Sequence, residues 1–308
     1  VGVACGGVWP PVEPGVRIVE CAGDACLPRG PGAHLVPEIG ERGVAGEVGR
    51  AVRLAQVKLK AWPLHPVDEA RPVLAPLRPG LYLDLRQPDG APDFSGVASL
   101  SDLRHEEIVW LARQEGFAGE LVHEDGWFEW RRDIDFQPQA IYSDRGRLWI
   151  EGGTMVEEGK DIPYIEHWHR EPVAGSPEWA ARLEDRETGQ KGAIARLGSL
   201  FMIARERYCE TPAGLTLSEC VEGAADIARA RDFIDCEISQ GAVTSAGWIV
   251  QRSSLPFREG KAVMPCLAAG ILETADMDAK GRPFARRWEI TDLRGEPLLD
   301  VTENGVTR

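Results

Sequence analysis

The chain contains no CxxC motif and no apolar run long enough to cross a membrane. Its seven cysteines are an odd number in a chain of 308 residues, and none is spaced as in a zinc ribbon or a thioredoxin-type motif. We therefore expect free thiols and a reducing, cytoplasmic location. The apolar runs stay well below the roughly 20 residues that a membrane helix needs. No charged start leads into an apolar core as in a signal peptide.

Basic residues are scarce relative to acidic ones. The 35 lysines and arginines face 49 aspartates and glutamates, which gives a net charge of −14. Phosphate backbones and anionic lipid surfaces both attract the opposite charge. We predict that neither a nucleic acid nor a membrane is a partner, and that the acidic excess keeps the protein soluble.

Motifs for nucleophilic catalysis and phosphate binding are also missing. The sequence has no GxSxG, and its Gly-rich segment "GGVWPPVEPG" places prolines where backbone amide donors would be needed. Cys209, Cys220, Cys236 and Cys266 all follow the last histidine, His169, so the segment that holds them contains no histidine. No cofactor is predicted.

The first 50 residues differ in composition from the rest. They are rich in Gly, Pro and Arg and contain no lysine, which predicts a disordered or non-native extension over residues 1–50. The following segment, residues 51–78, is predicted to be a linker with a short helix. That helix is expected in "GEVGRAVRLAQVKLKAW", where apolar residues recur at helical spacing.

From about residue 79 the chain consists of short alternating segments separated by turns, and their pattern occurs twice. "GLYLDLR" at 80–86 matches "SLFMIAR" at 199–205, and "GWFEWRRDIDF" at 126–136 matches "GWIVQRSSLPF" at 247–257. The common order predicts an internal duplication of a small all-β domain. Each copy is either a closed antiparallel barrel or a sandwich.

The predicted boundaries follow from this repeat. The first β domain spans 79–172, a linker spans 173–192, and the second β domain spans 193–308. From residue 79 onward, helical patterning is limited to three stretches, which are "LRHEEIVWLARQ", "SPEWAARLEDRE" and "EGAADIARARDF".

The motif order resembles a known family. "GLYLDLRQP", "DRGRLWIEGGTMVEEG" and "YIEHWHREP", followed by a second copy ending in "RRWEITD", are similar to the fungal Hri-type family. The resemblance covers residues 79–295. It implies two tandem lipocalin-like β-barrels and a protein-binding role, because that family is named for interaction with a casein-kinase homologue. It implies no catalytic residue.

The segment "YIEHWHREP" contains two histidines with the spacing of metal ligands. His167 and His169 share one face of a strand, but a zinc or non-haem iron site usually needs at least three protein ligands. A cupin-type site would need a later glutamate than Glu171. The second copy has Arg287 and Glu289 in place of the histidines. We therefore expect the histidines to face outward, with a metal site as the alternative.

The opposite face of the same strand carries recurring aromatic residues, which is typical of a barrel interior. A charge inside a barrel must be paired, so Glu166 is predicted to pair with Arg131 or Arg170. The predicted ligand-binding residues are Tyr164, Glu166, Trp168, Arg170, Trp127 and Arg131. A neighbouring pair, Asp133 and Asp135, is predicted to share one face near Arg131.

The favoured function is a non-catalytic binding protein. It would hold a small apolar or amphipathic molecule in a barrel cavity or act as a protein-interaction scaffold. The alternative is an enzyme. One form is a metal-dependent oxygenase or hydrolase that uses His167 and His169. The other is a cofactor-free isomerase or cyclase with Glu166 or Asp133 as the acid–base group.

Overall fold

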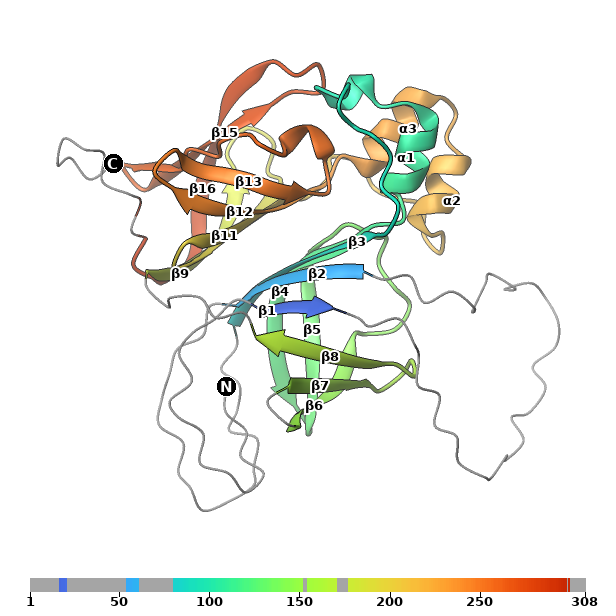
Figure 1. The fold of residues 1–308 in the computed structure, drawn as a ribbon, viewed down its shortest axis with the longest axis vertical. Helices are drawn as coiled ribbons and strands as arrows, with labels where there is room; N and C mark the ends of the chain where they lie inside the picture. The colour runs from blue at the N-terminus through green and yellow to red at the C-terminus, as the bar shows by residue number, and fades with distance from the viewer. Residues whose placement is uncertain are drawn as a thin grey trace.

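The structure is a computed structural model that describes residues 17–20, 54–60, 80–151, 154–170, 177–297 and 299. For 17–20, 54–60 and 169–170 it describes the backbone alone. Figure 1 shows two curled antiparallel sheets, one above the other, with the helices gathered at one side.

The first sheet is a closed barrel in which the strands follow one another in chain order and β8 pairs with β1. Its strands are β1 (Arg17–Glu20), β2 (Leu54–Lys60), β3 (Gly80–Pro88), β4 (Glu115–Glu124), β5 (Trp127–Asp135), β6 (Arg145–Glu151), β7 (Thr154–Gly159) and β8 (Ile165–Arg170).

The second sheet has eight strands in the order β13-β12-β11-β10-β9-β16-β15-β14. Its strands are β9 (Glu178–Asp185), β10 (Lys191–Leu197), β11 (Leu200–Arg205), β12 (Glu237–Thr244), β13 (Gly247–Ser253), β14 (Cys266–Ala268), β15 (Ile271–Met277) and β16 (Pro283–Gly295). The pairing of β16 with β9 repeats the pairing of β8 with β1.

Residues between β13 and β14 continue the wall of the second sheet. The Val263 amide donates to the Trp248 carbonyl at 2.9 Å, and the Ala275 amide donates to the Val263 carbonyl at 2.6 Å. These two hydrogen bonds connect β13 to β15 through Val263. In the first barrel the start of β6 occupies the corresponding place next to β5. The two sheets therefore curl in the same strand order, and the all-β fold with two antiparallel barrel-like sheets is confirmed.

Helices are few and short. They are η1 (Leu100–Asp102), α1 (His105–Leu111), α2 (Leu217–Glu222), α3 (Ile227–Ile234) and η2 (Pro256–Arg258). The helices predicted in "LRHEEIVWLARQ" and "EGAADIARARDF" are confirmed as α1 and α3. None of the described helices is both long and apolar enough to pass through a membrane.

Three expectations about chain organisation are wrong where the structure describes them. Strand β1 lies within the segment predicted to be disordered, and β2 is a strand where a helix was expected. Strand β9 lies within the predicted linker 173–192, at the predicted helix "SPEWAARLEDRE". Its residues alternate between two buried surfaces, and this packing outweighs the helix propensity of Ala, Arg and Glu. The rest of residues 1–50 lies outside the described residues.

The repeat holds in topology, but the predicted alignment is shifted by one residue at one hairpin. Trp127 pairs with Glu124 beside the first hairpin turn, whereas Gly247 pairs with Thr244 beside the second. Phe128 therefore corresponds to Trp248, and both are buried. Trp127 points outward and is half-buried.

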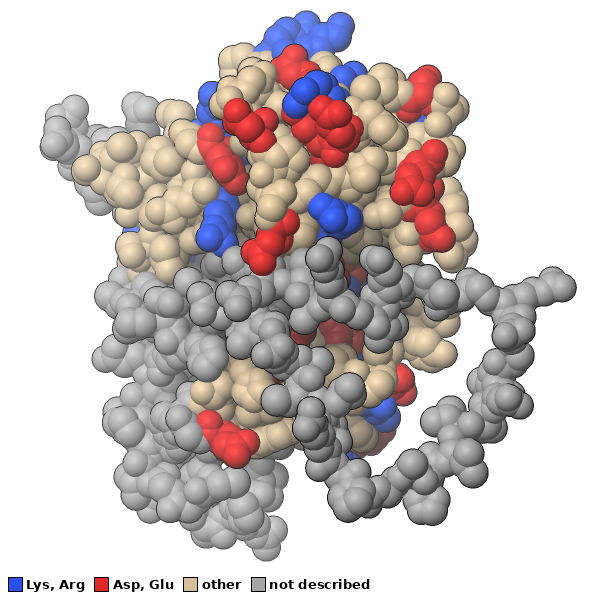
Figure 2. Space-filling model, turned by 45° about the vertical axis from the view of Figure 1, so that its right-hand side comes forward, with Lys and Arg blue, Asp and Glu red and all other residues tan. Residues whose placement is uncertain are grey.

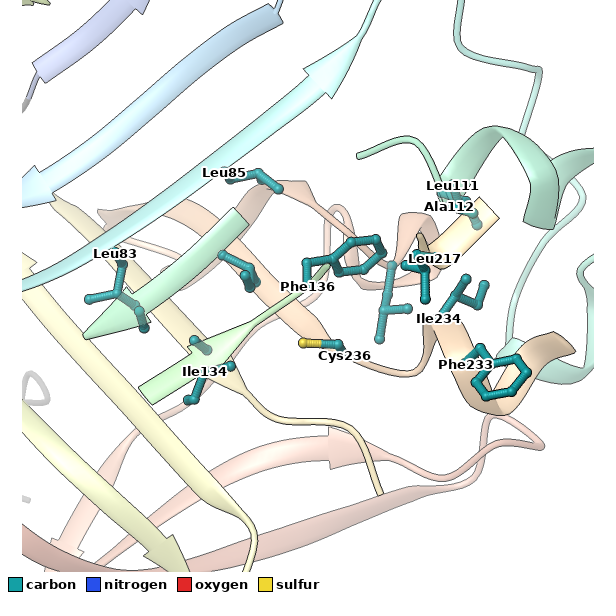
Figure 3. Packing of buried hydrophobic residues seen from close by; sticks show 14 of the residues in the cluster. Leu83, Leu85, Leu111, Ala112, Ile134, Phe136, Leu217, Phe233, Ile234 and Cys236 are labelled. Atoms are coloured by element: carbon teal, nitrogen blue, oxygen red, sulfur yellow. The ribbon is translucent and has the colours of Figure 1, made fainter. Parts of the chain in front are cut away.

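The two barrels pack against each other through one large hydrophobic core. Strand β3 contributes Leu81, Leu83 and Leu85 from its outer face, and the second sheet contributes small residues such as Ala180 and Ala193. The helices cover one end of this core, where Figure 3 shows Leu111, Leu217 and Ile234 converging beside Phe136 and Cys236. Alanines opposite leucines allow the two sheets to approach closely.

Polar contacts also join the barrels. Arg182 of β9 contacts Asp133 of β5 at 2.9 Å and Glu120 of β4 at 3.3 Å. Arg294 of β16 contacts Glu120 at 3.0 Å. These ion pairs are partly exposed, so they contribute little to the stability of the protein. Their main effect is to fix the orientation of one barrel relative to the other.

Candidate functional site

The interior of the first barrel is lined by aromatic side chains. Trp130 and Trp168 stack with ring centroids 5.2 Å apart and planes inclined by 8°. Tyr82 meets Trp130 edge-to-face at 4.8 Å and Phe117 at 5.3 Å. Every second residue of these strands faces inward, and the rings contact one another across the barrel.

A buried ion cluster lies beside these rings. The Arg86 guanidinium donates to Asp84 at 2.8 Å and to Glu166 at 2.8 Å. The Asp84 side chain is 0 % exposed and those of Arg86 and Glu166 are 12 % and 13 % exposed. Burial alone would lower the pKa of Arg86, but Asp84 and then Glu166 outweigh burial and raise the pKa. The cluster is a bridge between β3 and β8.

A second polar chain runs through Tyr164. Its hydroxyl lies 3.0 Å from Asp144 and 2.9 Å from Glu157, and Glu157 also accepts from the Trp130 indole at 2.9 Å. Asp144 is held at 2.6 Å by Arg132. Burial, followed by the charge of the two carboxylates, raises the pKa of Tyr164. The phenol therefore remains a hydrogen-bond donor.

Arg132 also engages Asp135 at 2.9 Å and lies 3.9 Å from the Phe117 ring centroid. Burial raises the pKa of Asp135, although Arg132 opposes that rise. A β-bulge opposite Ala118 and Gly119 separates the two aspartates of "RRDIDF". Asp133 therefore faces Arg182 on the outside and Asp135 faces Arg132. The prediction that both share one face near Arg131 is wrong.

The structure brings together three of the six predicted ligand-binding residues. Tyr164, Glu166 and Trp168 face the interior of the first barrel. Arg131 does not, because it lies on the outer face and pairs with Glu124 at 2.7 Å and Glu129 at 3.2 Å. Trp127 is also on the outer face. The side chain of Arg170 lies outside the described residues.

The histidine pair is described in part. His167 is exposed on the outer face of β8, as expected, and the His169 side chain lies outside the described residues. Over the described part of the chain, no group of three or more His, Cys, Asp or Glu side chains is arranged to hold a metal ion. The metal alternative stays a prediction.

Sequence reasoning missed the partner of Glu166. Arg86 ends "GLYLDLR" and its counterpart Arg205 ends "SLFMIAR". They occupy matching positions of β3 and β11, where Arg205 is buried and Arg86 is mostly buried. An arginine that recurs four residues after an inward aromatic residue, Tyr82 in β3 and Phe201 in β11, was the available signal. Asp84 and Glu157 have no charged counterpart in the repeat, so no such signal marked them.

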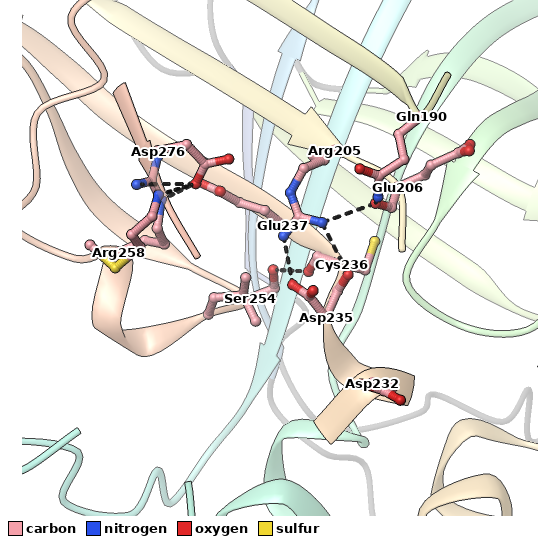
Figure 4. Close-up of polar contacts among 12 residues, drawn as sticks. Gln190, Arg205, Glu206, Asp232, Asp235, Cys236, Glu237, Ser254, Arg258 and Asp276 are labelled. Atoms are coloured by element: carbon pink, nitrogen blue, oxygen red, sulfur yellow. Dashed lines mark hydrogen bonds and ion pairs between the residues drawn. The ribbon is translucent and has the colours of Figure 1, made fainter. Parts of the chain in front are cut away.

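The second barrel encloses its own charged network, in which Arg205 contacts Asp235 at 2.6 Å and Arg258 contacts Glu237 at 2.9 Å (Figure 4). Arg286 contacts Asp276 at 2.7 Å. Burial alone would raise the pKa of Asp276, but the nearby guanidiniums lower it. Each carboxylate faces a guanidinium, so the arrangement is a closed structural network.

The cysteines of the second barrel take no part in a reactive arrangement. Cys209, Cys220, Cys236 and Cys266 are free thiols, and burial raises the pKa of Cys236 to about 11. A thiol with such a pKa stays protonated and inert.

Large apolar side chains are exposed at one end of the first barrel, on the loops before β6 and β8 and on the first residue of β8. Ile141 is 89 % exposed, Tyr142 58 %, Ile162 52 % and Ile165 57 %. The two loops are joined because Arg145 contacts Asp161 at 2.9 Å and accepts a hydrogen bond at its carbonyl from the Lys160 amide at 2.8 Å. We call these four residues the loop surface.

On the face of the second barrel that Figure 2 shows, acidic and basic side chains are interspersed. This face therefore carries no patch of a single charge that would mark another interaction site.

Comparisons with known proteins identify no family. No family model matches the chain, and no curated protein matches it. A solved structure that is similar is that of the uncharacterized protein YLR301w from Saccharomyces cerevisiae, with 10% sequence identity and a TM-score of 0.40. The match covers 92% of this chain and 100% of that chain. A likeness at this level says nothing about function.

Proposed function

We propose that the chain is a non-catalytic protein-binding scaffold that binds its partner through the loop surface. The observation that carries this proposal is the exposure of Ile141, Tyr142 and Ile162 on two joined loops and of Ile165 at the start of β8. Single exposed apolar residues are ordinary, but a gathered set marks an interaction site. Loops held on a rigid barrel are a common place for such sites.

The interior of the first barrel favours a protein-binding scaffold over a barrel that holds a small molecule. Trp168 is 3 % exposed and stacks on Trp130, and Arg86 joins Asp84 to Glu166 across the interior. Side chains that contact one another in this way stiffen the barrel beneath the loops. The small-molecule form of binding and the two enzyme alternatives stay predictions.

The resemblance to the Hri-type family belongs to the same proposal. The motif order that carries it lies on two successive barrel-like sheets, and the family's name implies a protein partner. We propose a cytoplasmic role on the basis of the free cysteines.

The test is selection of a random phage-displayed peptide library on the full chain. Selected peptides are then measured on a variant with Ile141, Tyr142, Ile162 and Ile165 all changed to Ser. We expect about tenfold weaker binding to this variant. Exposed side chains contribute little to stability, so urea unfolding should show that the variant still folds.

The matched control changes four exposed apolar residues elsewhere. Tyr208, Leu215, Ile227 and Met264 are 59%, 41%, 41% and 68% exposed, and their change to Ser should leave peptide binding unaltered. The proposal is overturned if no peptide is selected, or if the selected peptides bind the loop-surface variant as well as they bind the wild-type chain.

A further inference from the structure

Two cations lie against one indole ring next to the loop surface. The Arg147 guanidinium lies 4.8 Å from the Trp127 ring centroid and the Lys160 ammonium lies 4.6 Å from it. Both residues are exposed, whereas Trp127 is half-buried. Within the described part of the chain neither cation forms an ion pair. They are therefore held in place by the ring and remain available to an anion.

The strand register places these cations beside the loop surface. Arg147 of β6 is opposite Glu158 of β7, and Glu158 is opposite Ile165 of β8. Neighbouring strands are about 4.8 Å apart, so Arg147 and Ile165 sit two strand spacings from each other on the outer face. Lys160 is two residues before Ile162, and its backbone amide donates a hydrogen bond to the Arg145 carbonyl.

We propose that the partner of the loop surface is a protein segment that carries carboxylates beside aliphatic side chains. This inference rests on the proposed function. The aliphatic groups would cover Ile141, Ile162 and Ile165. The carboxylates would reach Arg147 and Lys160, because a guanidinium donates two parallel hydrogen bonds to a carboxylate and an ammonium attracts it as a point charge.

The net charge of the whole chain limits which residues can attract an acidic partner. At a net charge of −14 the protein repels an acidic partner in general, so attraction must come from local cations. Arg145 is engaged by Asp161, which leaves Arg147 and Lys160 as the cations of this surface. Glu158 lies between Arg147 and Ile165 and opposes an acidic segment. Glu158→Gln should therefore strengthen binding.

The test uses three synthetic peptides with the same aliphatic residues, in which the other positions are all Glu, all Lys or all Ser. Fluorescence anisotropy with the full chain measures their affinities. We expect the Glu peptide to bind best, and the double variant Arg147→Glu and Lys160→Glu to bind it about tenfold less tightly. The double variant Lys191→Glu and Lys280→Glu makes the same change of charge on the second barrel and should bind as the wild-type chain does.

The outcomes separate this inference from the proposed function. Equal or tighter binding of the Lys or Ser peptide overturns the acidic partner, while loss of that binding in the four-serine loop variant would keep the loop surface as a binding site. Failure of the Glu peptide to bind overturns the inference as well. Binding of the wild-type chain to phosphatidylserine vesicles that requires Arg147 and Lys160 would assign the cations to a membrane and overturn it.

Discussion

At the scale of single residues, the interior of the first barrel depends on one arginine. Arg86 is the cation between Asp84 and Glu166, and Asp84 is fully buried. Arg86→Met would leave two buried carboxylates without this guanidinium, and loss of one partner of a buried ion pair costs about 3–5 kcal/mol. We expect the free energy of unfolding, measured in urea, to fall by that amount.

Arg131→Met is the matched control, because sequence reasoning proposed Arg131 for the same role. Arg131 pairs with Glu124 and Glu129 on the outer face and is 48% exposed. Surface pairs contribute about 0–1 kcal/mol. An equal loss of stability in the two variants would contradict the assignment of Arg86.

Asp276 determines how the second barrel responds to acid. Burial alone would raise its pKa, but Arg205, Arg258 and Arg286 lower it below the ordinary 3.8. Its ionised form therefore stabilises the fold fully above the ordinary pKa, and this contribution is lost as the pH falls through the lower pKa of the folded state. Asp276→Asn should cost about 3–5 kcal/mol near neutral pH.

The difference in unfolding free energy between wild-type and Asp276→Asn should shrink from pH about 5 to pH about 3. Urea unfolding at several pH values measures this difference. Glu273→Gln is the control, since Glu273 lies on the outer face of the same strand and is 42% exposed. A difference that stays constant as the pH falls would show that Asp276 is not held ionised by its arginines.

At the scale of strands, the β4–β5 pair depends on a glycine at its bulge. A Cβ on Gly119 would lie 1.9 Å from the Arg131 carbonyl oxygen, which is backbone and cannot rotate away. Gly119→Ala should cost about 1–3 kcal/mol or more. Thermal unfolding followed by circular dichroism measures the loss.

Gly96→Ala provides the comparison, because a Cβ there meets nothing within 4 Å. That variant should match the wild-type protein or exceed its stability slightly. The β12–β13 pair also has a glycine at its bulge, since a Cβ on Gly241 would lie 2.2 Å from the Ile249 carbonyl oxygen. If Gly119→Ala were as stable as Gly96→Ala, the bulge would not require glycine.

The sequence predicts strands well where alternation has one buried face, and less well elsewhere. Inward Trp168 and Trp288 were identified because both copies carry them. Strand β9 was missed because both of its faces are buried, so that Ala180 faces the other barrel while Trp179 and Ala181 face the interior. Such a segment loses the alternating polarity by which a half-buried strand is recognised.

The site was predicted in part for a related reason. Tyr164, Glu166 and Trp168 share one short strand, and period-two alternation is enough to place them together. The position of Trp127 depends on hairpin turn length, and a shift of one residue moves a side chain to the other face. The pairing of Arg86 with Glu166 joins residues far apart in sequence, which no local pattern reveals.

At the scale of the whole molecule, the buried core between the barrels couples them. Leu83 is 0% exposed and belongs to the same cluster as Ala180, Ala193 and Met202 of the second sheet. Neither barrel can unfold without exposing apolar surface of the other. The two copies of the repeat should therefore unfold in one cooperative transition, although each has its own interior.

Leu83→Ala tests this coupling. It removes a side chain from the shared core and should cost about 2–5 kcal/mol. Fluorotryptophan labelling with 19F NMR in urea follows each barrel separately, through Trp168 in the first and Trp288 in the second. Both resonances should lose their folded intensity at one urea concentration, and the variant should lower that concentration equally for both. A Trp288 transition that stays at the wild-type urea concentration while that of Trp168 moves would show that the barrels unfold independently.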